Sequence, residues 1–532
     1  MKSLLNSIKN FFWPAESAIR IRRAELTFWA FILALGYLPI HIGFVAWIAL
    51  ARPFMIVSRL SGREAFNAAY FFAFMANLFQ LYWVAVVTPP GMVAAVVILS
   101  LYPALVLLAF SKVYHWKKWI GLAILPSLWV GMEYARSLSQ FAFPWTDLAY
   151  SMGYYLTFIQ IASVIGCYGI SFVIILFNIF TWQVFEPGNR LETRVTSGIA
   201  FLGIAVFMFV YGWVVFEPYP EEGKIRIAML QGNIPLGTKW KPETRMYNFD
   251  LYDSLTAEAV KNDTLDLIVW PETAAPAYPQ HERRYRFRLQ NTARQSGTKH
   301  LVGALDVEYE GSKEKAYNAA FQFDSSGAID GIYHKVKLVP FSEHVPYQDH
   351  LTFLTRDFLA KYLDAIETRE VQWWSDFYTG DSIVLFNVDY HWYAVLICFE
   401  SAFPDFCRQA ILEGAEFLVN ITNDTWFGYS PGPFQHMRLA VFRAVENRSW
   451  VVRCANSGIS AFIDPFGREF DRGELYARGI HKHNIYPVKD YTFFTRNGPI
   501  IGKISALIMA SVFVILILLW LFGKTSKRKS AR

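Results

Sequence analysis

Seven long apolar stretches constrain this chain more than any other feature, because each of them could lie in a membrane. A helix that spans a bilayer needs about 20 consecutive apolar residues, and most of these stretches reach that length. They lie at 26–50, 66–87, 92–110, 119–134, 156–182, 197–216 and 501–522. Only 18% of the 532 residues are charged, against about 25% in an average soluble protein. The sequence therefore predicts a multi-pass α-helical membrane domain.

The basic residues predict how the chain is threaded, because Lys and Arg favour the cytoplasmic side of a membrane. Basic clusters lie at 2–23, 52–63, 112–118, 190–194 and 524–532. All of them can share one side only if the first stretch, 26–50, crosses twice as a helical hairpin broken near Gly36–Pro39. We therefore expect about eight spans with both termini in the cytoplasm. The first apolar stretch is too long for a cleavable signal peptide.

The segment between the last two stretches is predicted to lie on the other side of the membrane. This divides the chain into membrane helices at 1–216, an outer domain at 217–497, and a last helix with a basic tail at 498–532. The net charge of +6 is too small to indicate nucleic-acid binding. Four cysteines are too few for a disulfide framework, and Cys167 falls inside a predicted span.

The outer domain alternates short apolar strands with helical patterns, which is typical of a layered α/β fold. Strands are expected within 224–234, 266–271, 299–309, 318–338, 382–400 and 415–424, the second of them stopping at Pro271. Helices are expected at 242–260, 281–296, 404–413 and 435–448.

Several of these predicted strands end in polar side chains that do not suit a core. They are Glu272, Lys335, Cys398, Glu400 and the pair Asn423–Asp424. Taken singly, each has an ordinary explanation, and a cysteine that closes an apolar run is usually a small core residue. Taken together they supply a nucleophile, a general base and a cation for the oxyanion of a tetrahedral intermediate. The helix expected after Cys398 should also favour a thiolate near its N-terminus.

The segments that carry these residues resemble the Glu–Lys–Cys triad of the nitrilase superfamily. They are "WPET" with Glu272, "YHKVKLVPFSEHVP" with Lys335 and Glu343, and "ICFE" with Cys398. Further segments resemble the apolipoprotein N-acyltransferase family: "FPW" at 143–145, "QGNIPLGTKW" at 231–240, "TNDTWFG" at 422–428 and the segment 435–467. This resemblance implies a nitrilase-like αββα sandwich. It also implies transfer of an acyl chain from a phospholipid to the N-terminal amine of a diacylglyceryl apolipoprotein.

The resemblance assigns roles to individual residues. It makes Glu272 the general base, Lys335 the oxyanion stabiliser and Cys398 the nucleophile of a ping-pong reaction through a thioester. The supporting and substrate-binding residues that we expect are Trp240, Glu343, Glu400, Asn423 and Trp426. At Phe399 the sequence departs from the family, which commonly has Tyr after the nucleophile, so we assign Phe399 a packing role only.

Aromatic segments at 371–378 and 425–434 predict a lid over the site or an anchor in the membrane interface, although they could also pack on the domain itself. His334, His344 and His436 lack the spacing of metal ligands, so we expect them to be structural. No metal or cofactor is predicted. The expected partners are membrane lipid, a phospholipid donor and a lipoprotein acceptor, with no nucleic acid. We expect a monomer in the bacterial inner membrane, with its outer domain in the periplasm.

Two alternatives share these residues. A membrane-tethered amidase or nitrilase would pass the acyl group to water with the same triad. A catalytically silent scaffold could keep the fold alone. The multi-pass frame argues against the first alternative, because a hydrolase of small amides needs no lipid-facing helices. The presence of all three triad residue types argues against the second.

Overall fold

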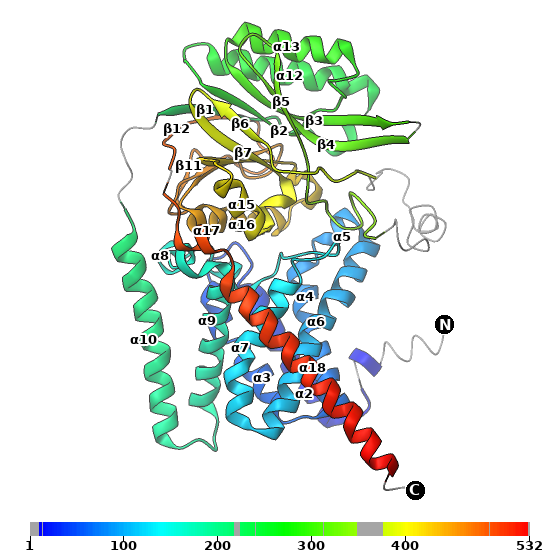
Figure 1. Cartoon of the computed structure of the whole chain (residues 1–532), viewed down its shortest axis with the longest axis vertical. Coiled ribbons are helices and arrows are strands. Elements are labelled where there is room, and N and C mark those ends of the chain that lie inside the picture. The colour runs from blue at the N-terminus through cyan, green and yellow to red at the C-terminus, as the bar shows by residue number, and fades with distance from the viewer. Residues whose placement is uncertain are drawn as a thin grey trace.

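The structure is a computed structural model that describes residues 10–12, 14–217, 224–239, 241–311, 313–347, 376–488 and 490–529. Figure 1 shows a bundle of helices with a region of two β-sheets stacked on one end. The chain builds most of the helices first and then the sheets. It returns along the bundle with its last helix, α18.

The helices of the bundle correspond to the apolar stretches of the sequence. Their bounds are α2 Ser17–Leu35, η1 Gly43–Trp47, α3 Ala51–Ser58, α4 Gly62–Leu81, α5 Val84–Val87, α6 Pro89–Trp116, α7 Lys118–Ala135, η2 Leu148–Met152, α8 Leu156–Ile159, α9 Ala162–Phe185, α10 Leu191–Val215 and α18 Ile500–Lys529. Within the described residues, four segments are long and apolar enough to cross a membrane: Gly91–Trp116, Ala162–Phe185, Leu191–Val215 and Ile500–Phe522. The other predicted spans fall on shorter or less apolar helices.

The first apolar stretch changes direction inside its length. Helix α2 ends at Leu35, with Gly36 as its C-cap. Arg52, in α3, then forms an ion pair with Glu25, in α2. These two residues are 27 positions apart and lie on helices separated only by η1, so the chain doubles back between them. Whether both arms cross a membrane stays a prediction.

The outer domain contains two six-stranded sheets. The first has the order β12-β1-β2-β3-β4-β5, with β1 Ile225–Gln231, β2 Leu267–Ala275, β3 Lys299–Glu310, β4 Lys313–Phe323, β5 Ile329–His334 and β12 Gly479–Ile485. The second has the order β11-β10-β9-β8-β7-β6, with β6 Leu385–Val388, β7 His391–Ile397, β8 Phe417–Thr422, β9 Trp450–Ala455, β10 Ala461–Ile463 and β11 Glu469–Phe470. Strands β1 to β3 are parallel in one sheet and β7 to β9 in the other.

The two sheets pack face to face, and helices cover their outer faces. Buried aliphatic side chains of both sheets, such as Val269, Val395 and Val419, share one core. Helices α12 Pro242–Val260 and α13 Arg283–Ser296 lie over the first sheet (Figure 1). Helices α15 Pro404–Leu412 and α16 Gly432–Asn447 lie between the second sheet and the bundle. The layers are those of an αββα sandwich, as the sequence resemblance implied.

The sequence-based expectation for β2 was wrong at its C-terminal end. The strand does not stop at Pro271 but continues to Ala275, so Glu272 lies inside it. The pairing of β2 with β3 is irregular between Trp270 and Ala275, since Pro271 has no N–H to donate to a ladder. Thr273 adopts a positive φ of 47°. The sequence analysis also missed β9 to β12, which have no clear alternation of apolar and polar residues.

The outer domain is joined to the bundle by packing and by hydrogen bonds. The buried residues of the bundle and those on the outer face of the second sheet form one hydrophobic cluster. Glu446, in α16, accepts a hydrogen bond from the backbone N–H of Cys167, in α9. Gln435, also in α16, accepts one from the indole N–H of Trp83 and one from that of Trp145. These contacts fix the outer domain against the helices.

Candidate active site

Cys398 follows β7 directly and opens the short helix η4, Cys398–Ala402. Its φ is +54°, a left-handed conformation that is unfavourable for a residue with a Cβ and is commonly found at functional sites. The side chain is partly exposed, whereas the other three cysteines of the chain are buried. Because β7 ends at Ile397, Cys398 lies at the end of a strand, as the sequence analysis predicted.

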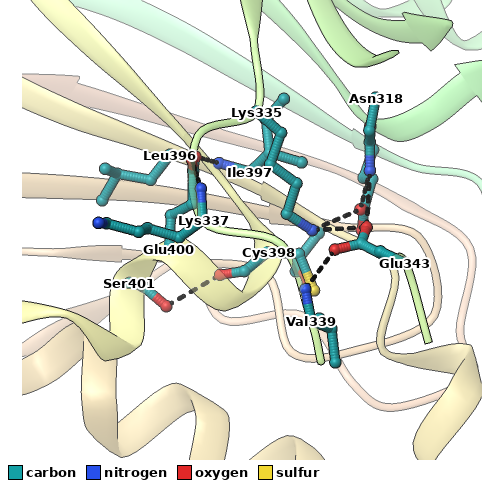
Figure 2. Close-up of polar contacts among 12 residues, drawn as sticks. Asn318, Lys335, Lys337, Val339, Glu343, Leu396, Ile397, Cys398, Glu400 and Ser401 are labelled. Carbon is teal, nitrogen blue, oxygen red and sulfur yellow. Dashed lines mark hydrogen bonds and ion pairs between the residues drawn. The ribbon is translucent and has the colours of Figure 1, made fainter. Parts of the chain in front are cut away.

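Lys335 follows β5 and is fully buried. Its Nζ lies 2.8 Å from Glu343 Oε1 and 3.7 Å from Glu272 Oε1. Burial alone would lower the pKa of Lys335, but the charges of Glu343 and Glu272 outweigh it and raise the pKa above its ordinary value. Lys335 is therefore a fixed cation. Figure 2 shows Lys335, Glu343 and Cys398 converging on one point.

Asn318, in β4, holds the two carboxylates and was missed by the sequence analysis. Its Nδ2 donates to Glu272 Oε1 at 2.8 Å and to Glu343 Oε1 at 3.2 Å. The backbone N–H of Val339 donates to the other oxygen of Glu343. The only signal in the sequence was an Asn at the start of the apolar run "NAAFQF", where a polar side chain needs a buried partner.

Lys239 is a second lysine beside the site that the sequence analysis did not single out. It is buried, and its Nζ donates to the backbone carbonyl of Glu272 at 2.9 Å. Burial lowers the pKa of Lys239 to about 7, although the charge of Glu272 opposes this shift. Lys239 thus supports the irregular part of β2 that carries Glu272.

Glu400 connects the loop of Lys335 to the strand of Cys398. It is fully buried. Its Oε1 accepts hydrogen bonds from Tyr333 Oη and from the backbone N–H groups of Val336 and Lys337, and its Oε2 accepts one from Ile397 N–H. A carboxylate accepts several such bonds at once. Glu400 is thereby part of the framework that sets the distance between nucleophile and cation.

The expectation that a helix N-terminus would favour the thiolate was wrong. Helix η4 is a single short turn, and α15 begins only at Pro404. Burial raises the pKa of the Cys398 thiol, the charge of Glu272 adds to this, and Lys335 opposes it without cancelling it. At rest the sulfur is therefore protonated, and its chemistry requires a base that removes the proton as the sulfur attacks.

A cavity of about 210 Å³ joins these groups to the helical bundle. Glu272, Lys335, Glu343 and Cys398 line one part of it, with Asn423 and Trp426 nearby. The part formed by α5 and α6 is lined by Val84, Val87, Thr88, Gly91, Ala94, Ala95, Ile98 and Leu99. Most of these side chains are apolar, so the cavity can hold a hydrocarbon chain against the reactive groups.

Phe399 forms part of the cavity wall through ring stacking. Its ring lies nearly parallel to that of Trp145, at 6.2 Å and 15°, and to that of Phe143, at 5.8 Å and 27°. Both partners come from the "FPW" segment between α7 and η2. Phe399 therefore packs against this segment, as the sequence analysis expected; that it has no further role stays a prediction.

Trp240 and the segment 371–375, with most of the predicted aromatic insertion, lie outside the described residues. Among the described residues, no group of three His, Cys, Asp or Glu side chains could hold a metal ion. The Nε2 atom of His334 lies 2.7 Å from a carboxylate oxygen of Asp306, and the Nδ1 atom of His436 lies 2.9 Å from one of Asp424.

The outer domain matches a known protein family. Residues 226–481 match the carbon-nitrogen hydrolase family. Crystal structures of an amidase from Nesterenkonia sp. and of Saccharomyces cerevisiae Nit3 are similar at 19% and 20% identity, with TM-scores of 0.36 and 0.37. They cover 53% and 50% of this chain, and 95% and 91% of their own. The fold and the family match define the outer domain as a carbon–nitrogen hydrolase domain of the nitrilase type.

The helical N-terminal part of the chain matches a more specific family. Residues 29–180 match the apolipoprotein N-acyltransferase N-terminal domain. The apolipoprotein N-acyltransferase of Geobacter metallireducens is 34% identical over 88% of this chain and 90% of its own length. That of Chlorobaculum tepidum is 29% identical over 87% and 90%. The chain belongs to the apolipoprotein N-acyltransferase family.

Proposed function

We propose that this chain is an acyltransferase that completes bacterial lipoproteins. It moves a fatty acyl chain from a membrane phospholipid to the N-terminal amine of the diacylglyceryl-cysteine of an apolipoprotein. The observation that carries this proposal is the single cavity shared by Glu272, Lys335 and Cys398 with the apolar side chains of α5 and α6. A cavity of this kind suits a lipid substrate. It gives an amidase of small soluble amides no advantage, so the hydrolase alternative is not favoured.

The first half-reaction would acylate the enzyme. Glu272 takes the proton of the Cys398 thiol as the sulfur attacks the ester carbonyl of the phospholipid. The ammonium of Lys335 stabilises the oxyanion of the tetrahedral intermediate. The carbon–oxygen bond to the glycerol then breaks, and protonated Glu272 returns its proton to the departing lysophospholipid. The product is a thioester on Cys398.

The second half-reaction would release the acyl chain to the acceptor. The neutral amine of the lipoprotein attacks the thioester, and Lys335 again stabilises the oxyanion. The carbon–sulfur bond breaks, and the proton lost by the amine returns to Cys398 by way of Glu272. Because one cavity serves both lipids in turn, donor and acceptor follow a ping-pong order. Trp426 and the loop 425–434 are candidates for the gate.

The placement of the enzyme in the cell is part of the proposal. About eight spans would hold it in the inner membrane as a monomer. The helices of 1–216 and the last helix with its tail, 498–532, would form the membrane domain. The segment between them, 217–497, would be the periplasmic catalytic domain. Both termini would be cytoplasmic. The inactive-scaffold alternative is disfavoured by the ion pairs that Lys335 makes with two carboxylates in the cavity.

The decisive experiment incubates the purified enzyme with phospholipid alone and measures its intact mass. Wild type should gain one acyl chain, and Cys398→Ala should gain none. Cys398→Ser should lose transfer to a diacylglyceryl lipopeptide. The matched control is Cys407→Ala. Burial raises the pKa of the Cys407 thiol to about 12, and its Sγ donates a hydrogen bond to the carbonyl of Glu400. Because this thiol is therefore not poised to attack a substrate, the Cys407→Ala enzyme should keep an activity within about threefold of wild type.

Transfer by Cys398→Ala would contradict the proposal. Steady-state rates with donor and acceptor varied together should give parallel double-reciprocal lines. Intersecting lines would mean that both lipids bind together, which would refute the ping-pong order even if Cys398 proved essential.

A further inference from the structure

A second cavity lies where α15 meets α7 and α9, and we call it the α15 cavity. Its volume is about 270 Å³, against about 210 Å³ for the cavity of Cys398. Among the residues that the structure describes, none lines both cavities. Figure 1 shows α15 at the boundary between the sheets and the helical bundle. The α15 cavity is therefore a separate site at the end of the bundle that carries the outer domain.

One chain segment and one pair of rings separate the two cavities. Lys335 and Val339 line the cavity of Cys398, whereas Lys337, between them, lines the α15 cavity. The ring of Phe399, in the first cavity, meets the ring of Phe403, in the second, edge to face at 5.1 Å. A ligand in the α15 cavity would therefore lie against the segment that carries the proposed oxyanion stabiliser.

The α15 cavity contains one group of each charge. Lys337 Nζ lies 5.7 Å from the ring centroid of Phe403 and 5.9 Å from that of Phe406. Aromatic rings attract an ammonium without using its N–H donors. Asp405 Oδ1 accepts a hydrogen bond from Arg408 Nε, and the Asp405 side chain is 44% exposed. Its second oxygen can accept from a ligand. Hydroxyl groups complete the polar lining: Tyr134, Ser137 and Tyr168.

The surroundings of the α15 cavity suit a lipid. Leu138, which lines it, is 64% exposed. Helix α18 passes close to its two tyrosines, since a Cβ at Gly502 would come within 3.1 Å of Tyr134 and Tyr168. Ile504, one turn further along α18, is exposed. Apolar side chains on the outside of a membrane helix contact lipid. A phospholipid with its head group in the α15 cavity can therefore extend its acyl chains along α18.

We propose that the α15 cavity binds the head group of a phospholipid other than the acyl donor, and that this head group is zwitterionic with a primary ammonium. Lys337 binds the phosphate, and Asp405 binds the ammonium. A primary ammonium donates three hydrogen bonds, for which the carboxylate and the hydroxyls are acceptors, whereas a quaternary ammonium donates none. The inference rests on the proposed placement of the bundle in a membrane and is independent of the acyl transfer.

Photo-crosslinking of the full-length enzyme in detergent micelles tests the site. The probes are dialkyl-ether phospholipids with a diazirine near the glycerol end of one chain, and they carry an ethanolamine, a choline or a glycerol head group. They have no ester carbonyl for Cys398 to attack. Mass spectrometry then maps the labelled peptides. In wild type, the ethanolamine probe should label residues 134–138 and 404–409 about fivefold more than either other probe. Labelling within 84–99, at the cavity of Cys398, is the internal reference.

Two variants separate the two charges of the head group. Lys337→Met removes the partner of the phosphate and should reduce labelling of these peptides by all three probes about fivefold. Asp405→Asn removes only the partner of the ammonium, so the ethanolamine probe should lose its advantage over the glycerol probe. The matched control is Lys261→Met, at an exposed lysine that caps α12, which should be labelled like wild type.

Equal labelling of these peptides by the ethanolamine and choline probes, or by the ethanolamine and glycerol probes, would overturn the proposal. Labelling that survives Lys337→Met would also overturn it. If Lys337→Met does not fold, Lys337→Gln removes the charge and keeps a polar side chain, and unchanged labelling there has the same meaning.

The outcome is distinguishable from a failure of the proposed function. An enzyme that is labelled as expected but never transfers a phospholipid acyl chain would refute the acyl transfer and leave the α15 cavity supported as a lipid site. An enzyme that transfers acyl chains but shows no labelling at 134–138 and 404–409 would overturn this inference alone.

Discussion

Glu400 illustrates how one buried carboxylate can set the geometry of a site that it does not enter. It binds the loop after β5 and the end of β7, the two segments that carry Lys335 and Cys398. Burial raises its pKa above the ordinary value, although hydrogen bonds, first that from Ile397 N–H, oppose the shift. The cost of burying the carboxyl group is therefore offset by donors on both segments.

We expect Glu400→Gln to damage activity through geometry. The amide NH₂ would face backbone N–H donors that need an acceptor, and each buried donor left unpaired costs about 1–3 kcal/mol. Acyl-enzyme formation should fall at least about tenfold, and the melting temperature should drop. Intact-mass kinetics and a thermal melt measure both. Wild-type rates would show that Glu400 does not set the distance between Lys335 and Cys398.

Asp424 predicts a pH dependence of stability. Burial would raise its pKa, but Arg453 and His436 lower it to about 2. Because the folded-state pKa lies below the unfolded value, the stabilisation is complete above about pH 4 and is lost as the pH falls towards 2. Asp424→Asn leaves Arg453 without its buried carboxylate, which costs about 3–5 kcal/mol at neutral pH.

The difference in melting temperature between wild type and Asp424→Asn should therefore shrink between pH 4 and pH 2. Thermal melts of both proteins across that range measure it. A difference that stays constant with pH would contradict the ionised state of Asp424.

At the scale of elements, α6 contributes to the site although it carries no reactive group. Residues of one of its faces line the cavity of Cys398, while Val93, Val97 and Leu101 are exposed. Apolar side chains on the outside of a membrane helix contact lipid. In the proposed function, α6 would guide an acyl chain from the bilayer to Cys398.

Filling the cavity from α6 should block long chains. Ala95→Phe places a ring among the side chains that line it and should lower acylation by a long-chain phospholipid about tenfold or more. A donor with short acyl chains should be less affected. The matched control is Val97→Phe, on the exposed face of α6, which should behave like wild type. Equal effects on long and short donors would argue against an acyl chain in this part of the cavity.

At the scale of the whole molecule, the bundle has two distinct ends. Figure 1 shows the sheets at one end, and the turn between α9 and α10 and the C-terminus at the other. The end away from the sheets carries basic residues, among them Arg190 and Arg194 around the start of α10. Such an asymmetry orients a membrane protein with its basic end in the cytoplasm.

Reporter fusions test this orientation. Fusions after Lys112, Arg194 and Lys524 should report the cytoplasm, and a fusion within 217–497 should report the periplasm. A periplasmic signal after Lys112 would contradict the double crossing of residues 26–50. It would also place the active site on the wrong side of the membrane.

The sequence by itself determined the class of each part of the molecule. Long apolar runs predicted the helices of the bundle, and short apolar strands that end in Lys335, Cys398 and Asn423 predicted a layered domain with a site at strand ends. These are local properties, since hydrophobic periodicity and residue type depend on a few neighbours in the chain.

Only the tertiary structure decided which groups meet. Asn318 bridges Glu272 and Glu343 from a strand 46 and 25 residues away, and Gln435 binds Trp83 across 352 positions. No periodicity reports such contacts, because they arise when separate elements pack and each buried polar group must find a partner. The same reason explains why the sequence analysis missed Lys239.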